Sequence, residues 1–388
     1  MMTTLPDTEW TTRADLRELV AALGEGNARW VGGAVRDTLL GQPVKDIDCA
    51  TPLEPREVIA RCKAAGIRTV PTGIDHGTVT ALCENGNVEI TTLRRDVSTD
   101  GRRATVAFSE NWKEDAARRD FTINALYAEP GSGEVYDYFG GLDDIATRTV
   151  RFIGDARERI REDHLRILRY FRFQARFGSE PPDAEAIAAC EELAPTLKGI
   201  SRERIAMELL QILVAPDEMD TLARMDALGV LDVILPEADL AQADVVRWER
   251  QNELRPEPIR RLAGLLPPDP EIASKVAGRL RLSNAQKKRL RLAAAREPAD
   301  ADDPRGLAFR YGLETANDRL AILGASNAEL RGWEPPQFPL KGGEIVKRGV
   351  KAGPDVARLM QTVEKRWIAE GFPDRERVDA LLDEELEK

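Results

Sequence analysis

The stretch from Trp30 to Thr51 constrains this 388-residue chain more than any other, because two adjacent glycines separate an apolar run from a helix-like segment. It reads W-V-G-G-A-V-R-D-T-L-L-G-Q-P-V-K-D-I-D-C-A-T. A short helix is predicted to follow Gly32 and Gly33, over residues 34–40, and to end at the next glycine. After a proline break, residues 44–50 are predicted to form a strand. The stretch therefore predicts a strand, a glycine turn, a short helix and a second strand.

Two acidic residues lie two positions apart in the second predicted strand. Asp46 and Asp48 are expected to face the same side of a sheet, because side chains alternate along a strand. Paired carboxylates repel unless a cation lies between them, and hard oxygen ligands favour Mg²⁺. The N–H groups of Gly32 and Gly33 at a helix start suit the phosphates of a triphosphate. A plain glycine turn before a solvated edge strand is the simpler alternative, and the nearby Arg36 argues against it.

The composition is ordinary for a soluble cytoplasmic protein, which is the predicted location, and the length allows two to four domains. Charged residues make up 32% of the chain and apolar residues 42%. No apolar run approaches the roughly twenty residues of a membrane span, and the N-terminus lacks a signal-peptide pattern. The cysteines are scattered without a C-x-x-C pair, so reduced buried thiols are expected at Cys49, Cys62, Cys83 and Cys190.

The net charge of −11 argues against indiscriminate nucleic-acid binding, but basic residues gather in two stretches. Residues 148–176 contain nine arginines against four acids, and residues 272–296 contain eight Lys or Arg and no acid. Such stretches suit a polyanion held along a defined track. Solvated basic helix faces are the alternative, above all for the second stretch.

A third acidic residue is predicted to lie beside the first two. A helix is expected from Thr51, as N-cap, to about Ala65, and strands over residues 67–71 and 77–83 follow. The turn E-N-G-N leads into a strand over residues 88–94. Glu89 lies on this strand and is the candidate third carboxylate for a two-metal site; a surface acid is the alternative.

The segment E-D-A-A-R-R-D-F-T-I-N-A-L-Y, residues 114–127, predicts a helix that ends at two arginines and a strand that returns to the sheet. Arg119 offers bidentate donors to triphosphate oxygens. Asp120 and Asn124 are candidates to orient that arginine or a ribose.

Residues 155–173 predict one helix with a buried face, since apolar residues recur at three to four positions. Asp163 and Arg166 are expected one turn apart on another face, and Arg169 and Arg172 continue that stripe. Cytosine and adenine both present an amino donor beside a ring-nitrogen acceptor, which a carboxylate next to a guanidinium complements. An ordinary surface ion pair is the alternative.

Together these motifs resemble the bacterial-type (class II) tRNA nucleotidyltransferases and bacterial poly(A) polymerases, within the superfamily of DNA polymerase β. The resemblance rests on G-G-A-V-R-D, K-D-I-D-C-A-T and R-R-D-F-T-I-N-A, and it is strong over residues 29–210. It implies that E-D-H-L-R, with Glu162, reads the base without a nucleic-acid template. It also implies a flexible loop at residues 94–105 that switches C addition to A addition. I-S-R-E-R-I, with Ser201 as helix N-cap, resembles a neck motif that we interpret as structural.

The fold class implied is α+β: a polymerase-β-like head with a small mixed sheet, followed by an all-helical neck, body and tail. The predicted domains are a catalytic head over residues 1–150, a base-reading neck over 151–212, an RNA-binding body over 213–300 and a tRNA-binding tail over 301–388.

The predicted function is addition of CCA to tRNA, with Mg²⁺ bound by Asp46 and Asp48 and assisted by Glu89. CTP, ATP and tRNA are the expected partners, with neither DNA nor a membrane. A bacterial poly(A) polymerase, or an enzyme that adds only CC or only A, is the nearest alternative. A non-catalytic RNA-binding protein on the same scaffold is a remote one.

Overall fold

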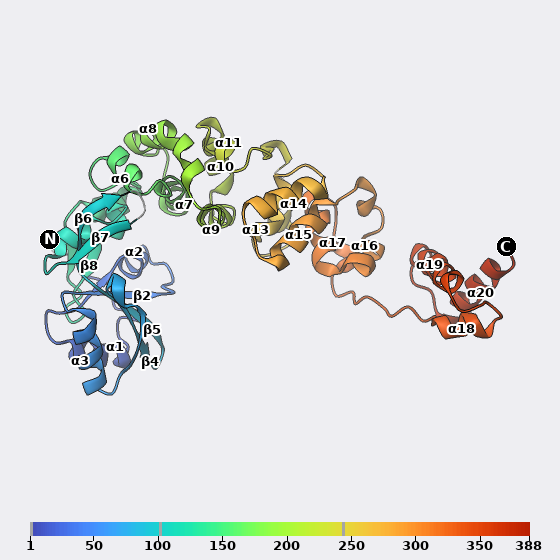
Figure 1. Cartoon of the computed structure of the whole chain (residues 1–388), viewed down its shortest axis with the longest axis horizontal. Helices are drawn as coiled ribbons and strands as arrows, with labels where there is room; N and C mark the ends of the chain where they lie inside the picture. The colour runs from blue at the N-terminus through green and yellow to red at the C-terminus, as the bar shows by residue number, and fades with distance from the viewer. Residues whose placement is uncertain (1–2, 101–102, 243–244) are drawn as a thin grey trace. The chain divides into compact units, whose positions relative to one another are not determined.

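The computed structural model describes residues 3–100, 103–242 and 245–388, and it divides the chain into two compact units. The first unit spans Met1–Pro236 and the second Glu237–Lys388. Each unit is described by itself (Figure 1).

The first unit contains a sheet-based head followed by helices. Its strands are β1 (Arg29–Val31), β2 (Ile47–Thr51), β3 (Arg68–Gly73), β4 (Thr78–Cys83), β5 (Gly86–Thr92), β6 (Arg94–Asp100), β7 (Arg103–Phe108), β8 (Leu126–Ala128) and β9 (Val135–Asp137). Its helices are α1 (Ala14–Leu23), α2 (Gly33–Leu39), α3 (Pro55–Ala64), α4 (Trp112–Ala117), α5 (Gly141–Thr147), α6 (Ala156–Glu162), α7 (Arg166–Phe177), α8 (Ala184–Leu193), α9 (Arg202–Ile212), α10 (Glu218–Ala227) and α11 (Val230–Ile234).

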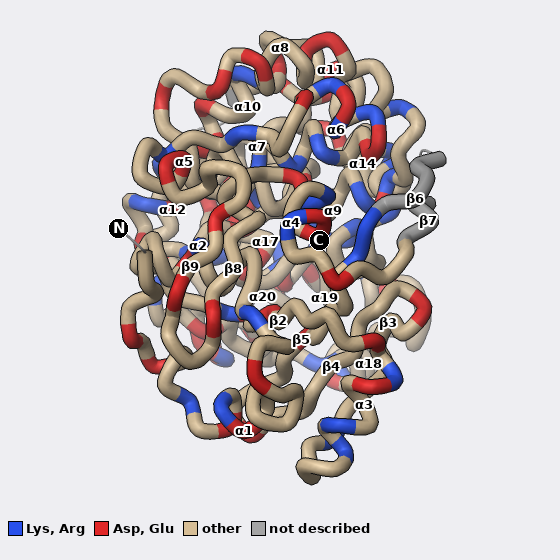
Figure 2. The backbone as a smooth tube through the Cα atoms, turned by 90° about the vertical axis from the view of Figure 1, so that its left-hand side faces the viewer, with Lys and Arg blue, Asp and Glu red and all other residues tan. Residues whose placement is uncertain are grey.

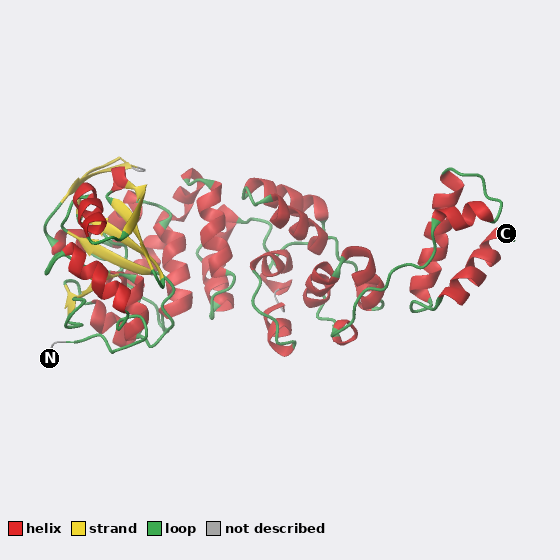
Figure 3. Cartoon of the chain, turned by 90° about the horizontal axis from the view of Figure 1, so that it is seen from below, coloured by secondary structure: helices red, strands yellow, loops and turns green. Residues whose placement is uncertain are grey.

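The second unit is built from α12 (Val245–Gln251), α13 (Pro258–Gly264), α14 (Pro270–Arg279), α15 (Asn284–Ala294), α16 (Pro304–Tyr311), α17 (Leu313–Ile322), α18 (Gly342–Lys347), α19 (Pro354–Ala369) and α20 (Arg375–Leu386). Strands gather in the N-terminal part of the chain and helices make up the rest (Figure 3). The predicted α+β class, with a small mixed sheet ahead of an all-helical remainder, is confirmed.

The head sheet has seven strands in the order β3-β4-β5-β2-β1-β8-β9. Only β2 and β5 pair in parallel, and the remaining neighbours are antiparallel. The parallel register places Asp48 opposite Glu89, while β1 places Val31 opposite Asp48. Because alternate side chains share a face, Asp48, Ala50 and Glu89 face one side of the sheet.

The two faces of the sheet are covered differently. On one face, α1 and α3 pack against Trp30, Cys49, Val88 and Ile90 in a buried apolar cluster (Figure 1). The opposite face carries a smaller cluster that includes Val31, Ala50, Leu93 and Tyr127. Asp48 and Glu89 therefore lie on the face that α1 and α3 leave uncovered.

Several local predictions are wrong at their boundaries. The strand predicted over residues 44–50 begins only at Ile47, because pairing with β5 starts there and pairing with β1 starts at Asp48, so Asp46 precedes the strand. Thr51 ends β2 instead of capping a helix, and α3 starts after Glu54 with Pro55 in its first turn. Ser201 does take the N-cap position of α9, but its side chain makes no capping hydrogen bond.

The loop expected without regular structure over residues 94–105 is largely an antiparallel hairpin of β6 and β7, in which Arg94 pairs with Phe108 and Asp100 with Arg103. Residues 101 and 102 of the predicted loop lie outside the described residues. The Asp-Gly dipeptide at residues 100–101 is a hairpin signal that the sequence offered.

Buried ion pairs join the helices of the second unit. Asp318 on α17, fully buried, accepts hydrogen bonds from Arg260 Nε at 2.8 Å and from Arg289 Nε at 2.7 Å. Glu249, 1% exposed, accepts from Arg260 Nη1 at 2.8 Å and from Arg261 Nε at 2.9 Å. This network ties α12, α13, α15 and α17 together. Among the described residues, no helix has the length and apolar character needed to cross a membrane.

Replacing Asp318 by Ala should destabilise the second unit by about 3–5 kcal/mol, because it removes the fully buried carboxylate that both Arg260 and Arg289 share. Glu314 is the matched control: it also pairs with Arg289, at 2.7 Å, but its side chain is 66% exposed, so Glu314→Ala should cost at most about 1 kcal/mol. Hydrogen exchange of α13 and α17 in the full chain measures both. Equal protection in the two variants would contradict a structural role for the network.

Candidate nucleotide-binding and catalytic site

The glycine turn between β1 and α2 brings backbone close to an arginine. Gly32 has φ 68°, a left-handed conformation that favours glycine, and Gly33 begins α2. A Cβ atom on Gly32 would lie 3.5 Å from Nη1 of Arg119. The N–H groups in the first turn of a helix have no acceptor within the helix. The N–H of Gly32 donates to the carbonyl of Leu126 at 3.2 Å, so the prediction that it faces a phosphate is wrong, and the turn offers an anion the N–H groups from Gly33 onward, beside Arg119.

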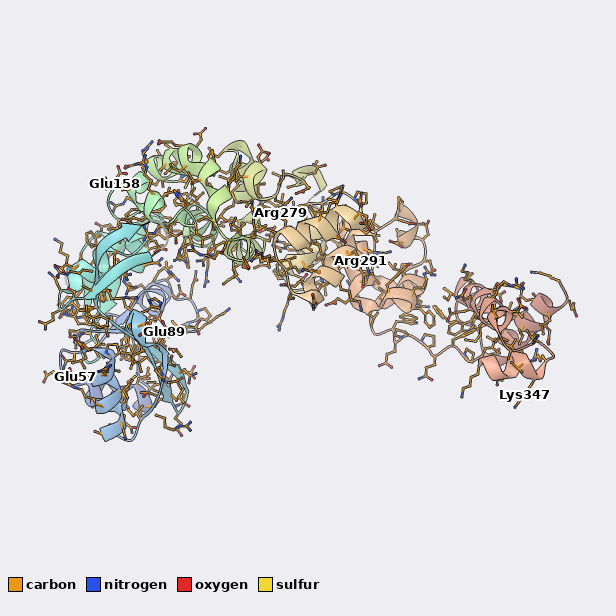
Figure 4. The ribbon with its side chains drawn as sticks, in the orientation of Figure 1. Glu57, Glu89, Glu158, Arg279, Arg291 and Lys347 are labelled. Carbon is orange, nitrogen blue, oxygen red and sulfur yellow. The ribbon has the colours of Figure 1, made fainter. Side chains whose placement is uncertain are left out.

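The three candidate carboxylates do not lie on equivalent elements. Asp48 and Glu89 are neighbours across the β2–β5 pair, and Glu89 is exposed (Figure 4). Asp46 is also exposed and lies just before β2, so its backbone is not fixed by the sheet. The structure thus confirms that Glu89 lies on a strand next to the one that carries Asp48.

Asp48 is the carboxylate whose protonation the site affects most. Burial raises its pKa, the neighbouring Glu89 and Asp46 carboxylates raise it further, and Arg119 opposes them, giving a value of about 6. A divalent cation would relieve this repulsion. Within the described ranges, no group of three His, Cys, Asp or Glu side chains is arranged to hold a metal ion by itself. Two carboxylates fit Mg²⁺ that also takes substrate phosphate oxygens and water as ligands.

Arg119 is held by two buried side chains. Its Nε donates to the hydroxyl of Tyr127 at 3.1 Å, and its Nη2 donates to Asp115 Oδ2 at 3.2 Å. The Tyr127 hydroxyl donates to the same Asp115 oxygen at 2.7 Å. Burial by itself would raise the pKa of Asp115, but Arg119 and Tyr127 hold it below its usual value. Burial by itself would lower the pKa of Arg119, but Tyr127 and Asp115 hold it above its usual value.

A second chain of hydrogen bonds engages the other residues of the two head motifs. Arg36, 6% exposed, donates from Nε to Asp37 at 2.8 Å and from Nη1 to Asn124 Oδ1 at 2.5 Å. Asn124 donates to Asp120 at 3.0 Å, and Asp120 accepts from Arg169 Nε at 2.9 Å. Asp120 and Asn124 therefore orient Arg169 and Arg36, and not Arg119 as one prediction held.

The helix predicted over residues 155–173 is two helices, α6 and α7, separated at Asp163. Asp163 has extended backbone, φ −151° and ψ 102°, and its Oδ1 accepts the N–H of Leu165 at 3.2 Å. A short acidic side chain that binds nearby backbone competes with the helix, which explains the break. Asp163 and Arg166 are thus not one turn apart on a continuous helix.

Asp163 and Arg166 enter separate ion pairs. Asp163 Oδ2 accepts from Arg204 Nη2 at 2.6 Å, and Arg166 Nη1 donates to Glu162 at 2.5 Å. Arg172 donates to Glu208 at 2.6 Å. Basic and acidic residues alternate along α6, whereas α7 carries only basic ones, and their acidic partners lie on other segments (Figure 2).

Sequence reasoning missed several residues that touch the candidates, among them Asp37, Asp115, Tyr127, Arg204 and Glu208. Arg204 and Glu208 are spaced i, i+4 in the neck motif, so they lie on one face of α9 and both reach candidate base-reading residues. That spacing was a usable signal. Asp115 and Arg119 are also i, i+4, but nothing local indicated that their contact would be buried.

The second basic stretch is only partly available to a ligand. Arg279 pairs with Glu237 at 2.5 Å, Arg289 pairs with Asp318, and Arg296 is buried against backbone carbonyls of the loop after α13. Lys275, Lys288 and Arg291 are exposed, and Figure 4 labels Arg291 on α15 and Arg279 on α14. Three of the eight cations thus stabilise the fold.

Comparisons with known proteins show which families this chain resembles. Residues 28–151 match the poly A polymerase head domain, and residues 182–241 match the probable RNA and SrmB-binding site of polymerase A. The chain is 36% identical over 359 residues to the CCA tRNA nucleotidyltransferase 1, mitochondrial, of Danio rerio. The aligned residues cover 87% of this chain and 83% of the relative.

A bacterial relative and a solved structure are also similar. Identity to the CCA-adding enzyme of Streptococcus sanguinis is 41% over 246 residues, which covers 63% of this chain and 59% of that enzyme. The crystal structure of the Bacillus stearothermophilus CCA-adding enzyme in complex with CTP has a TM-score of 0.78 at 26% identity, and covers 96% of this chain and 98% of that one.

The raised pKa of Asp48 predicts a pH-dependent stability of the metal-free head. Between pH 3.8 and about 6 the folded state keeps a proton that the unfolded chain has lost, so the unfolding free energy falls as pH rises through this window. Asp48→Asn removes the charge and should raise the unfolding free energy by about 1–3 kcal/mol at pH 8 in EDTA, but not at pH 4.

Hydrogen exchange of β2 and β5 through a urea titration measures this difference. Asp46→Asn, at an exposed position outside the strand, is the control and should change little. If Asp48→Asn raises the unfolding free energy equally at pH 4 and pH 8, the substitution acts through packing and not through charge.

Proposed function

The chain belongs to the family of the CCA-adding tRNA nucleotidyltransferases, and on that premise we propose that it transfers CMP and AMP from CTP and ATP to the 3′ end of tRNA. This membership confirms the resemblance drawn from the sequence motifs. In the proposed reaction the tRNA 3′-hydroxyl oxygen bonds to the α-phosphorus, the bond to the bridging oxygen breaks, and pyrophosphate leaves. The order of added bases comes from the protein and not from a nucleic-acid template.

One observation carries the proposal. The β2–β5 register sets Asp48 beside Glu89, and β1, which pairs with β2 on the other side, ends at the Gly32 turn near Arg119. Carboxylates next to an anion-binding turn suit a phosphoryl transfer that needs positioning and charge compensation and no covalent intermediate.

We further propose Mg²⁺ as the cofactor, held by Asp46 and Asp48 with help from Glu89. When bound, Mg²⁺ would lower the pKa of the attacking hydroxyl and offset negative charge on the phosphates. Asp48 gives this site its fixed geometry, because β2 fixes its backbone, whereas Asp46 before the strand can adjust to the substrate. Tyr127 and Asp115 engage Nε and Nη2 of Arg119, so its Nη1, near Gly32, would donate to the triphosphate.

Base choice is proposed to lie with Asp163 and Arg166. Asp163 would accept from the exocyclic amine of cytosine or adenine, and Arg166 would donate to the ring nitrogen beside it. Both side chains are now in ion pairs, with Arg204 and Glu162. If both side chains turned to a base, Glu162 would keep its ion pair with Arg159, and the released Arg204, whose side chain is 38% exposed, could be hydrated. Arg169 and Arg172 would support the nucleotide from the same helix.

The tRNA is proposed to follow the exposed cations Lys275, Lys288 and Arg291, and we propose no role for DNA or a membrane. The division into head, neck, body and tail at residues 150, 212 and 300 stays a prediction, as does a cytoplasmic location, since a similar relative is named mitochondrial.

A poly(A) polymerase, or an enzyme limited to CC or A, would differ in product. Incubation with Mg²⁺, CTP, ATP and tRNAs truncated at successive 3′ positions distinguishes them.

In that assay Asp48→Ala or Asp46→Ala should lower incorporation by ~10³-fold or more, because each loses a metal ligand that acts in the transition state. tRNA binding, measured by filter retention, should stay nearly unchanged, since the carboxylates contact metal and not RNA. A variant that keeps a tenth of the wild-type rate would rule out this assignment.

Asp163→Ala should reduce CTP and ATP use and narrow their advantage over UTP and GTP, since a bidentate base contact discriminates by ~1–3 kcal/mol. Arg204→Met is a matched control, because it breaks the same 2.6 Å ion pair and leaves the carboxylate in place. Single-nucleotide incorporation of all four triphosphates measures both, alongside Arg166→Ala. If Arg204→Met relaxes base choice as much as Asp163→Ala does, base choice depends on the Asp163–Arg204 ion pair and not on a contact between Asp163 and the base.

A further inference from the structure

Asp115 is a buried carboxylate with three hydrogen-bond donors near the site, although no part of the proposed mechanism uses it. It lies on α4 and is 2% exposed. Its Oδ2 accepts from Tyr127 and Arg119, and its Oδ1 accepts the backbone N–H of Arg94 at 3.1 Å. One buried side chain therefore contacts a sheet tyrosine, an arginine of the site and the first residue of the β6–β7 hairpin.

The contacts on Oδ2 decide which edge of Arg119 meets the glycine turn. Tyr127 takes Nε and Asp115 takes Nη2, so Nη1 is the nitrogen that lies near Gly32. The Tyr127 ring lies 5.3 Å from the guanidinium carbon and is itself fully buried, which fixes the plane of the group. Without the carboxylate, the guanidinium would lose its charged partner and one of its two anchoring hydrogen bonds.

The contact on Oδ1 fixes where the hairpin starts. Arg94 follows Leu93, whose N–H donates to the carbonyl of Thr51 at 2.7 Å, at the end of the strand that carries Asp48. Ser109, just after the hairpin, donates its N–H to the carbonyl of Leu93 at 2.9 Å. Both ends of the hairpin thus meet at one point, and Asp115 is the side chain that joins this point to Arg119.

We propose that Asp115 is a positioning residue that couples the root of the β6–β7 hairpin to the triphosphate-binding arginine. Because the two oxygens of one rigid carboxylate serve the two partners, a displacement of the hairpin root turns the carboxylate and shifts Nη1 of Arg119. Conversely, a triphosphate that fixes Arg119 fixes the hairpin root. This inference rests on the proposed function, since it requires a triphosphate at Arg119.

The test is Asp115→Asn, which keeps the size of the side chain and removes its charge. Loss of a charge-assisted contact should raise the KM for both CTP and ATP ~10–100-fold, with kcat changed far less, because triphosphate binding is weakened in ground and transition states alike. The affinity for cytidine, which has no phosphate, should not change. Glu114→Gln, at an exposed position on the same helix, makes the same charge change. It keeps an oxygen for the Ser109 hydroxyl, which donates to Glu114 at 2.7 Å, so it should leave all three quantities as in wild type.

The coupling has its own readout in the amide exchange of Leu93 to Arg95. Saturating CTP should slow this exchange in the wild type but not in Asp115→Asn. Tyr127→Phe removes one anchor of Arg119 and leaves the Oδ1 bond to the hairpin root, so it should raise the KM for CTP and still show slower exchange when CTP is bound.

Each result has a defined meaning. If wild-type protein adds neither C nor A to truncated tRNA, the proposed function fails, independently of Asp115. If wild type is active but Asp115→Asn keeps its CTP affinity, or loses cytidine affinity equally, the positioning role is overturned. If circular dichroism shows that Asp115→Asn is unfolded, the Tyr127→Phe variant tests the proposal instead. The proposal is overturned if this variant has the wild-type KM for CTP, or if CTP no longer slows its amide exchange at Leu93 to Arg95.

Discussion

The parallel pairing of β2 with β5 is the interaction on which the candidate site depends. It is the one parallel pair of the seven-stranded sheet, and it sets Asp48 opposite Glu89. A shift of one residue would turn either carboxylate into the apolar cluster beneath α1 and α3, because side chains alternate along a strand. The buried residues Val88, Ile90 and Cys49 therefore hold the register that brings two like charges together.

Around this pair, arginines are held by buried acidic or amide groups. Asp115 and Tyr127 anchor Arg119, Asn124 anchors Arg36, and Asp120 anchors Arg169. A buried guanidinium without a partner is costly, so each anchor both stabilises the fold and fixes the direction of the donors left over. Stability and preorganisation of the site thus come from the same contacts. Arg119 offsets the repulsion at Asp48 only in part, and a divalent cation would offset more of it.

The helices of the first unit hold further charged residues near the site through ion pairs. The break at Asp163 turns the chain between α6 and α7, so that Asp163 reaches Arg204 while Arg169 and Arg172 face Asp120 and Glu208. The neck motif that we interpreted as structural therefore contacts the residues proposed to read the base. In the second unit, Asp318 and Glu249 likewise hold buried arginines. Asp318 also holds Arg289, which belongs to the basic stretch that the sequence offered as a possible RNA track.

The sequence by itself determined the fold class, the glycine turn, the strand that carries Glu89 beside Asp48 and the family, because spacing within a motif is local and survives folding. Tertiary structure alone decided which partner each charged group takes. Arg169 and Asp120 are 49 residues apart, and Arg204 and Asp163 are 41 apart, and no periodicity specifies such pairs. The start of β2 at Ile47 was likewise set from outside the segment, by pairing with β5 and β1. The helix break at Asp163 is local, because its side chain accepts the N–H of Leu165, and only its ion pair with Arg204 comes from α9. Helix and strand patterns report only which face is apolar, whereas burial of a charge requires a partner that the fold must supply.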